Sequence, residues 1–199
     1  MAGGSAVKHV SNQELYRYWN SRRGERRAPE RDDIEPGAIR RSLGDSFILA
    51  FDVPGGHPFR LAGTRLCGLF GRELRNEAFE SLWDPLDRAA VDQLAMVVAD
   101  EMGGVVAGAV GHTAEGYTID LELLLLPLRH HGNTHARQIG ALAPLATPYW
   151  AGSSPVEVIR LGTHRHLVEE TPNFRQLPPP DQPNRNRHGF TVYEGGRSG

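Results

Sequence analysis

Three glycines punctuate the segment FRLAGTRLCGLFGREL (residues 59–74), at Gly63, Gly68 and Gly71. A strand that ends on glycine and leads into a helix begins many phosphate-binding loops. The Walker loop needs G-x4-G-K-[ST], because its lysine reaches the phosphates and its hydroxyl holds magnesium. Here leucine and phenylalanine follow Gly68, and the dinucleotide fingerprint G-x-G-x-x-G is incomplete. We therefore interpret the glycines as structural: the first ends a strand and the others punctuate short helices.

Histidines form two groups that could ligate zinc together with a carboxylate. One group surrounds a predicted turn and the other is an H-x-H pair; they comprise His130, His131, His135, His164 and His166. A turn between strands is an exposed place, where histidines need no partner to be tolerated. We therefore expect no metal site from these residues.

Arginines are concentrated between residues 22 and 31, at Arg22, Arg23, Arg26, Arg27 and Arg31. Such a stretch could bind the phosphates of a nucleotide or a nucleic acid. Four acidic residues balance the charge locally: Glu25, Glu30, Asp32 and Asp33. We favour a solvated linker and keep an arginine-guided nucleotide binder as an alternative.

Composition limits the classes of protein to consider. The chain has 199 residues and a formal net charge of -2, so nothing indicates nucleic acid as an obligate partner. Cys67 is the only cysteine, which excludes an intrachain disulfide and a thiolate metal cluster. The start of the chain lacks the pattern of a secretory signal, and the longest apolar run, LLLLPL, is too short to span a bilayer. We expect a cytoplasmic protein that does not bind membranes.

The N-terminal part predicts a helix after a flexible lead of residues 1–10. Ser11 and Glu14 match a capping box, and the helix should end near Gly24. One face of it carries Leu15, Tyr16 and Trp19. This aromatic surface either packs back onto the domain or forms the seam of a homodimer or another partner interface.

The remaining pattern alternates between strands and helices. Residues 46–62 predict a hairpin, 63–83 short helical pieces, and Asp84–Pro85 the start of a helix that ends at a pair of glycines. The apolar stripe of that helix is Val91, Leu94, Ala95, Val98 and Met102. Three strands follow, over 105–112, 117–128 and 136–145, and then a piece at 156–163 that is either a strand or a docking segment. The proline-rich residues 166–199 predict a disordered tail.

This order predicts an α+β fold with a five-stranded antiparallel sheet, helices on one face, and an N-terminal helical extension over residues 11–44. The phrases FRLAGT and GREL, the tryptophan-containing first helix, FESLW and the R-x-D-I-x-P phrase make the chain resemble a PAS-like family of short, often single-domain alphaproteobacterial proteins. The resemblance covers roughly residues 13–165, and within it we expect the PAS-like domain at residues 45–165. It implies a sensory or regulatory module that binds a small molecule or a protein partner, and it implies no catalytic residues and no particular cofactor.

A sheet covered by helices on one side leaves a cavity for a small ligand between the two layers. The residues we expect to present to it are Arg60, Leu66, Cys67, Trp83, Tyr117 and Asp120. Asp120 shares a strand face with Thr118 and Glu122, and for that face we favour solvent, because a buried unpaired carboxylate is costly. Cys67 could react with a flavin, but we favour a small core residue. The predicted long helix, residues 86–102, carries no histidine for haem.

Two function classes compete with the sensor. An enzyme that uses the same cavity would need a catalytic base oriented by a second group, and we recognise no such motif in the sequence. Two titratable side chains in contact within the cavity would favour the enzyme. The nucleotide binder described above is the other alternative.

Overall fold

The computed structural model describes residues 7–51, 56–101 and 103–167. Within them the elements are α1 (Val10–Arg23), η1 (Arg31–Asp33), η2 (Pro36–Ile39), β1 (Ser46–Ala50), β2 (Phe59–Ala62), α2 (Thr64–Phe70), η3 (Phe79–Leu82), α3 (Arg88–Glu101), β3 (Gly104–Thr113), β4 (Thr118–His130), β5 (Asn133–Pro144) and β6 (Val156–Leu167), where η marks a 3-10 helix. In this part of the chain no helix is long and apolar enough to cross a membrane.

The strands form one sheet in the order β2-β1-β5-β4-β3-β6, with antiparallel neighbours throughout. The predicted hairpin of β1 and β2 is confirmed. The sheet has six strands where five were predicted. The additional strand is β6, which pairs along the edge of β3; its sequence alone allows either a strand or a docking segment. Its second half reads GTHRHL and is largely exposed, so the hydrophobic alternation of a strand is weak there.

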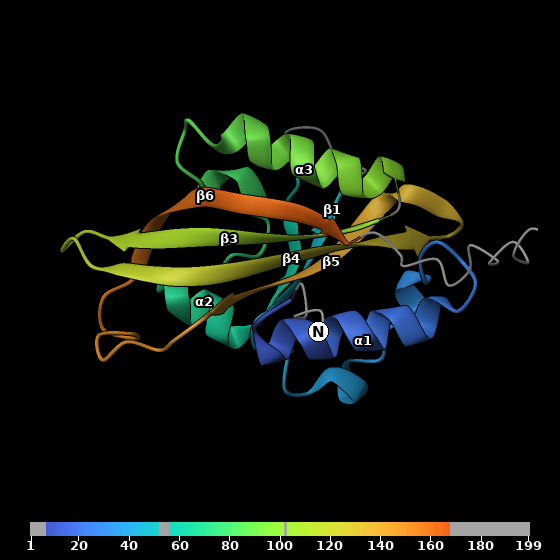
Figure 1. Cartoon of the computed structure of the whole chain (residues 1–199), viewed down its shortest axis with the longest axis horizontal. Helices are drawn as coiled ribbons and strands as arrows, with labels where there is room; N and C mark the ends of the chain where they lie inside the picture. The colour runs from blue at the N-terminus through green and yellow to red at the C-terminus, as the bar shows by residue number, and fades with distance from the viewer. Residues whose placement is uncertain (1–6, 52–55, 102, 168–199) are drawn as a thin grey trace, which may run out of the picture. The chain divides into compact units, whose positions relative to one another are not determined.

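One face of the sheet is covered by α2, η3 and α3 (Figure 1). The odd-numbered residues of β4, from Ile119 to Leu125, point into this core. The described part of the α3 stripe packs onto them, as predicted, through Val91, Leu94, Ala95 and Val98; the fifth member, residue 102, lies outside the described residues. The helix itself begins at Arg88, after a turn in which Asp84 accepts a hydrogen bond from the Leu86 backbone N–H.

The opposite face is covered by α1, so helices lie on both sides of the sheet (Figure 1). Leu15 and Trp19 are buried against the even-numbered leucines of β4, and the indole N–H of Trp19 donates to the carbonyl of Pro127 at 2.8 Å. Tyr16 is half-buried and stacks beside Trp19. Of the two alternatives expected for this aromatic surface, packing back onto the domain is what the structure shows for Leu15 and Trp19, because both side chains belong to the core of their own chain.

The residues just before α1 cover Glu122, which is only 4% exposed. Its carboxylate accepts hydrogen bonds from the backbone N–H groups of Lys8 and His9, both at 2.8 Å, and from the Asn12 amide at 3.1 Å. Asp120, two residues earlier on the same face of β4, is exposed. The two acidic side chains on this face of β4 therefore differ in exposure, because the chain before α1 packs over Glu122 and does not cover Asp120.

Asp87 anchors the outer edge of β6 to the turn that precedes α3. Its Oδ2 accepts from the Leu161 backbone N–H and from Arg160 Nε, both at 2.9 Å. The bond from Leu161, assisted by Arg160, lowers the pKa of Asp87 below its usual range.

We expect Asp87→Ala to lower the free energy of unfolding by about 1 kcal/mol at pH 7, because the Leu161 N–H loses its acceptor. A carboxyl whose pKa is lower in the folded state stabilises above its unfolded pKa of about 3.9, and that stabilisation disappears as the pH falls through the lowered folded pKa. In urea unfolding, the difference between wild type and variant should therefore shrink as the pH is taken from 7 toward 3. A difference that is constant over this range would contradict the role given to the ionised carboxylate.

Candidate functional site

A cavity of about 290 Å³ lies where α2 meets the ends of β4 and β5. Its apolar walls include Leu69, Ile119 and Leu142, and Gly68 of α2 also lines it. The other lining residues are Asp45, Arg65, Pro144, Thr147, Ala151 and Gly152. The volume is at the lower end of the range typical of small-molecule sites, and apolar walls with a few polar groups are their usual lining.

The polar end of the cavity is an ion pair. Arg65 Nε and Nη2 donate to the two carboxylate oxygens of Asp45 at 2.8 and 2.7 Å. The hydroxyl of Ser11, from the first turn of α1, donates to the same carboxylate at 2.7 Å. The hydrogen bond with Asp45 raises the pKa of Arg65, so the guanidinium stays charged. Asp45 is buried and fully bonded, whereas Arg65 is half-exposed and its Nη1 donates to no described residue.

Two titratable groups in contact within one cavity are the arrangement that would favour an enzyme. The Asp45–Arg65 pair does not supply acid–base chemistry, however, because arginine does not release its proton in proteins. Both oxygens of the Asp45 carboxylate already accept hydrogen bonds, two from the single Arg65 guanidinium and one from the Ser11 hydroxyl. The pair is suited to holding a ligand rather than to transforming it.

The structure does not bring together the six cavity residues expected from the sequence. Leu66, Cys67 and Trp83 are buried in the core. Arg60, Tyr117 and Asp120 lie at the surface, and none of the six lines the cavity beside α2. The ion pair at this cavity is instead formed by Arg65 and Asp45.

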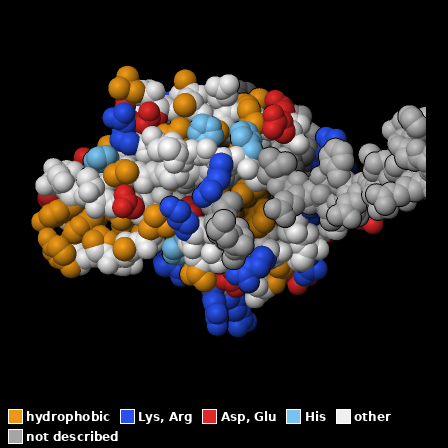
Figure 2. All heavy atoms as spheres, viewed as in Figure 1, with side chains coloured by type: hydrophobic (Ala, Val, Ile, Leu, Met, Phe, Trp, Pro, Cys, Tyr) orange, Lys and Arg blue, Asp and Glu red, His pale blue; other side chains and the backbone are white. Residues whose placement is uncertain are grey.

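Aromatic packing explains why the expected cavity is filled. Phe47, Phe59, Phe79 and Trp83 contact one another with ring centroids 5.5 to 5.8 Å apart. All four are almost completely buried between the sheet and η3. Tyr117 instead stacks on Trp150, with ring centroids 5.5 Å apart. On the face shown in Figure 2, hydrophobic side chains gather at the left end of the molecule.

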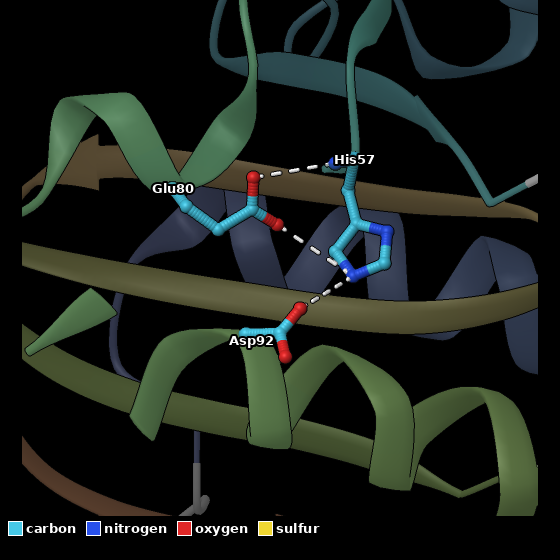
Figure 3. Close-up of side chains that lie close together, drawn as sticks. All are labelled: His57, Glu80 and Asp92. Atoms are coloured by element: carbon cyan, nitrogen blue, oxygen red, sulfur yellow. Dashed lines mark hydrogen bonds and ion pairs between the residues drawn. The ribbon is translucent and has the colours of Figure 1, made fainter. Parts of the chain in front are cut away.

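A second polar cluster lies on the side of the sheet that α2, η3 and α3 cover. There His57, Glu80 and Asp92 converge from the residues before β2, from η3 and from α3 (Figure 3). The Nε2 atom of His57 is 3.0 Å from Asp92 Oδ1 and 3.6 Å from Glu80 Oε1. The second oxygen of Glu80 accepts from the His57 backbone N–H at 3.2 Å. The ring of Phe51 stacks on the imidazole with centroids 3.8 Å apart.

Sequence reasoning missed this cluster. Its members come from three elements separated by more than ten residues each, and the spacing 57, 80, 92 matches no metal or catalytic signature. The one available signal was a histidine next to the glycine turn, just before the strand that leads into the core. Only the packing of η3 and α3 on the same side of β2 brings the three side chains together.

The histidines singled out from the sequence lie elsewhere. The rings of His130 and His131 are 4.2 Å apart at a turn, and the side chain of His135 lies outside the described residues. His166 Nδ1 is 3.9 Å from Glu101.

The arginine-rich stretch is partly neutralised within the chain. Arg22 pairs with Glu35 at 3.0 Å and Arg26 pairs with Asp33 at 2.7 Å. The bond from Arg26 lowers the pKa of Asp33. On the face shown in Figure 2, basic side chains occur in several separate groups.

A protein-family model described as "PAS domain" matches residues 7–143. The match begins before α1, so the N-terminal extension is part of the matched region. No curated protein matches the chain.

Several solved structures resemble the chain at low identity. The light-oxygen-voltage domain of aureochrome1 in its dark state is 16% identical, with 58% of this chain and 84% of that chain covered and a TM-score of 0.44. The Rhodobacter sphaeroides LOV protein is 14% identical, with 55% and 66% covered and a TM-score of 0.44. A PAS domain from Colwellia psychrerythraea is 14% identical, with 55% and 97% covered and a TM-score of 0.41. These identities are too low to transfer a ligand or an activity. On the strength of the family match, which spans more than half of its length, this chain belongs to the PAS domain family.

Proposed function

We propose that this protein is a sensory or regulatory module that binds a small amphipathic molecule in the cavity beside α2. Domains of this family are typically sensory and signalling modules. The observation that carries the proposal is a cavity of about 290 Å³ with mostly apolar walls and one charged end.

The residues at the charged end define the chemistry of the ligand. Both oxygens of Asp45 already accept hydrogen bonds within the chain, so it offers a ligand little. Arg65 keeps a cationic N–H group at Nη1 for an acceptor such as a carboxylate or a carbonyl oxygen. The body of the ligand would lie against Leu69, Ile119 and Leu142. A molecule with one acceptor group and a compact apolar body fits this lining.

The same ion pair connects the cavity to α1. Ser11, in the first turn of that helix, donates to Asp45, and Asp45 holds Arg65. A ligand that draws Arg65 toward itself would change the charge balance at Asp45 and hence its hydrogen bond with Ser11. The helix on the opposite face of the sheet would then be the output element, and a partner protein would respond to its position.

The residue that best tests this proposal is Gly68. It lies in the middle of α2, lines the cavity, and a Cβ added there would meet no atom within 4 Å. A leucine at this position therefore has room to enter the cavity, whereas an alanine adds only one methyl group.

We expect protein purified from its own source organism to retain a small molecule in native mass spectrometry, and Gly68→Leu to reduce the occupied fraction at least tenfold. The matched control Gly68→Ala should keep the ligand. The assignment of the cavity would be overturned if neither variant lost the ligand, or if both variants lost it equally.

A further inference from the structure

We propose that His57, Glu80 and Asp92 bind a divalent cation of the zinc class, with a coordination position left open to solvent (Figure 3). This inference does not rest on the cavity beside α2, and the two cation-binding carboxylates belong to different elements from those that line it.

The ligand atoms are already close to a coordination geometry. A tetrahedral zinc site with bonds of about 2.0 to 2.1 Å places its ligand atoms about 3.3 Å apart. Here His57 Nε2 is 3.0 Å from Asp92 Oδ1 and 3.6 Å from Glu80 Oε1, which brackets that value. One imidazole and two carboxylates also supply the two negative charges that a divalent cation requires.

The cluster carries an unmet requirement for a positive partner. Glu80 Oε1 is buried and makes no hydrogen bond within the described residues. A buried carboxylate oxygen without a partner costs free energy, and a cation at this point would supply the missing interaction. The other oxygen of Glu80 is occupied by the His57 backbone N–H, which fixes the direction of the free oxygen toward the imidazole.

The surrounding chain holds His57 in place for binding. Phe51 stacks on one side of the ring, and the whole residue is 8% exposed. The preceding residue is Gly56, where an added Cβ would lie 2.9 Å from Glu80 Oε2, so the absence of a side chain lets the carboxylate approach. Asp92 is different: its side chain is 53% exposed, which gives a cation a path in and leaves room for water as a further ligand.

A cation at this point would tie together the chain before β2, η3 and α3. Binding to Nε2 requires that nitrogen to be free of its proton, so zinc must displace the hydrogen bond that His57 makes to Asp92. Metal binding and the direct histidine–aspartate bond are thus alternatives for the same pair of atoms.

The test is isothermal titration calorimetry, in which ZnCl₂ is added to the full chain. Wild type should bind one tight equivalent, and Asp92→Asn should bind it at least tenfold more weakly, because asparagine keeps the hydrogen-bond acceptor and loses the charge. Glu101→Gln, on the same helix and exposed, is the matched control and should bind as wild type does. Equal affinity of wild type and Asp92→Asn would overturn the site.

A second readout separates this site from zinc bound by histidines at the surface. In ¹⁵N-detected imidazole spectra, the first equivalent of zinc should move the Nε2 signal of His57. The proposal is contradicted if that signal stays in place while other histidine signals move. Neither result depends on whether the cavity beside α2 binds a ligand, so the two proposals fail separately.

Discussion

Gly63→Ala should destabilise the protein by about 3 kcal/mol or prevent it from folding. An added Cβ would overlap the backbone carbonyl oxygens of Leu43 and Gly44. That backbone cannot retreat, because Gly63 N–H donates to Ser46 O at 2.8 Å and Leu66 N–H donates to Gly44 O at 2.9 Å. Overpacking costs roughly 1 to 3 kcal/mol where side chains can shift, and more where the backbone must move.

Gly68→Ala is the matched comparison, because it makes the same chemical change five residues further along. Gly68 lies inside α2 with open space around its Cβ position. Alanine is favoured over glycine in a helix interior by about 1 kcal/mol, so this variant should be more stable than wild type. Chemical denaturation of both variants would check the opposite signs. Equal destabilisation would contradict the packing described for this segment.

Glu122→Ala should lower the free energy of unfolding by about 3 kcal/mol. Removal of the carboxylate leaves the backbone N–H groups of Lys8 and His9 without their acceptor, whereas the Asn12 amide keeps its hydrogen bond to the backbone carbonyl of residue 122. Each unsatisfied buried donor costs roughly 1 to 3 kcal/mol, less whatever water recovers. The start of α1 should loosen at the same time, which hydrogen exchange at residues 8–12 would detect as faster exchange.

Asp120→Ala is the control for Glu122, on the same strand and the same face. Its side chain is exposed, so the free energy of unfolding should change by less than about 0.5 kcal/mol. The account of the N-terminal segment would be wrong if the two alanine variants were equally stable, or if exchange at residues 8–12 were unchanged in Glu122→Ala.

The fold was largely predictable because its signals are local. The hairpin, the apolar stripe of α3 and the roles of the glycines in segment 59–74 follow from hydrophobic periodicity and from turn-forming residues. The phrases that resemble the family are each contained in a short stretch of sequence. The position of α1 was not predictable in the same way. Apolar residues at both odd and even positions of β4 required cover on two faces, but the sequence did not say which helix would supply the second.

The candidate sites were less predictable, since they depend on contacts between distant elements. Arg60 lies in β2 and Arg65 lies in α2, which follows it. Of the two, Arg65 meets a carboxylate, because Asp45 lies beside the first turn of α2. Glu122 looked like a solvent-facing residue until the chain before α1 covered it. His57 gave no spacing signal, because its partners lie 23 and 35 residues away.

The most direct test of the ligand-binding proposal is a ¹H–¹⁵N spectrum of the labelled protein during titration with a library of amphipathic fragments that carry one carboxylate or amide group. The account predicts that binding fragments shift the amides of α2 near Arg65 and Gly68 together with those of Ile119, Leu142 and Gly152, and that Gly68→Leu abolishes these shifts. Shifts that map elsewhere, or that persist unchanged in Gly68→Leu, would contradict it.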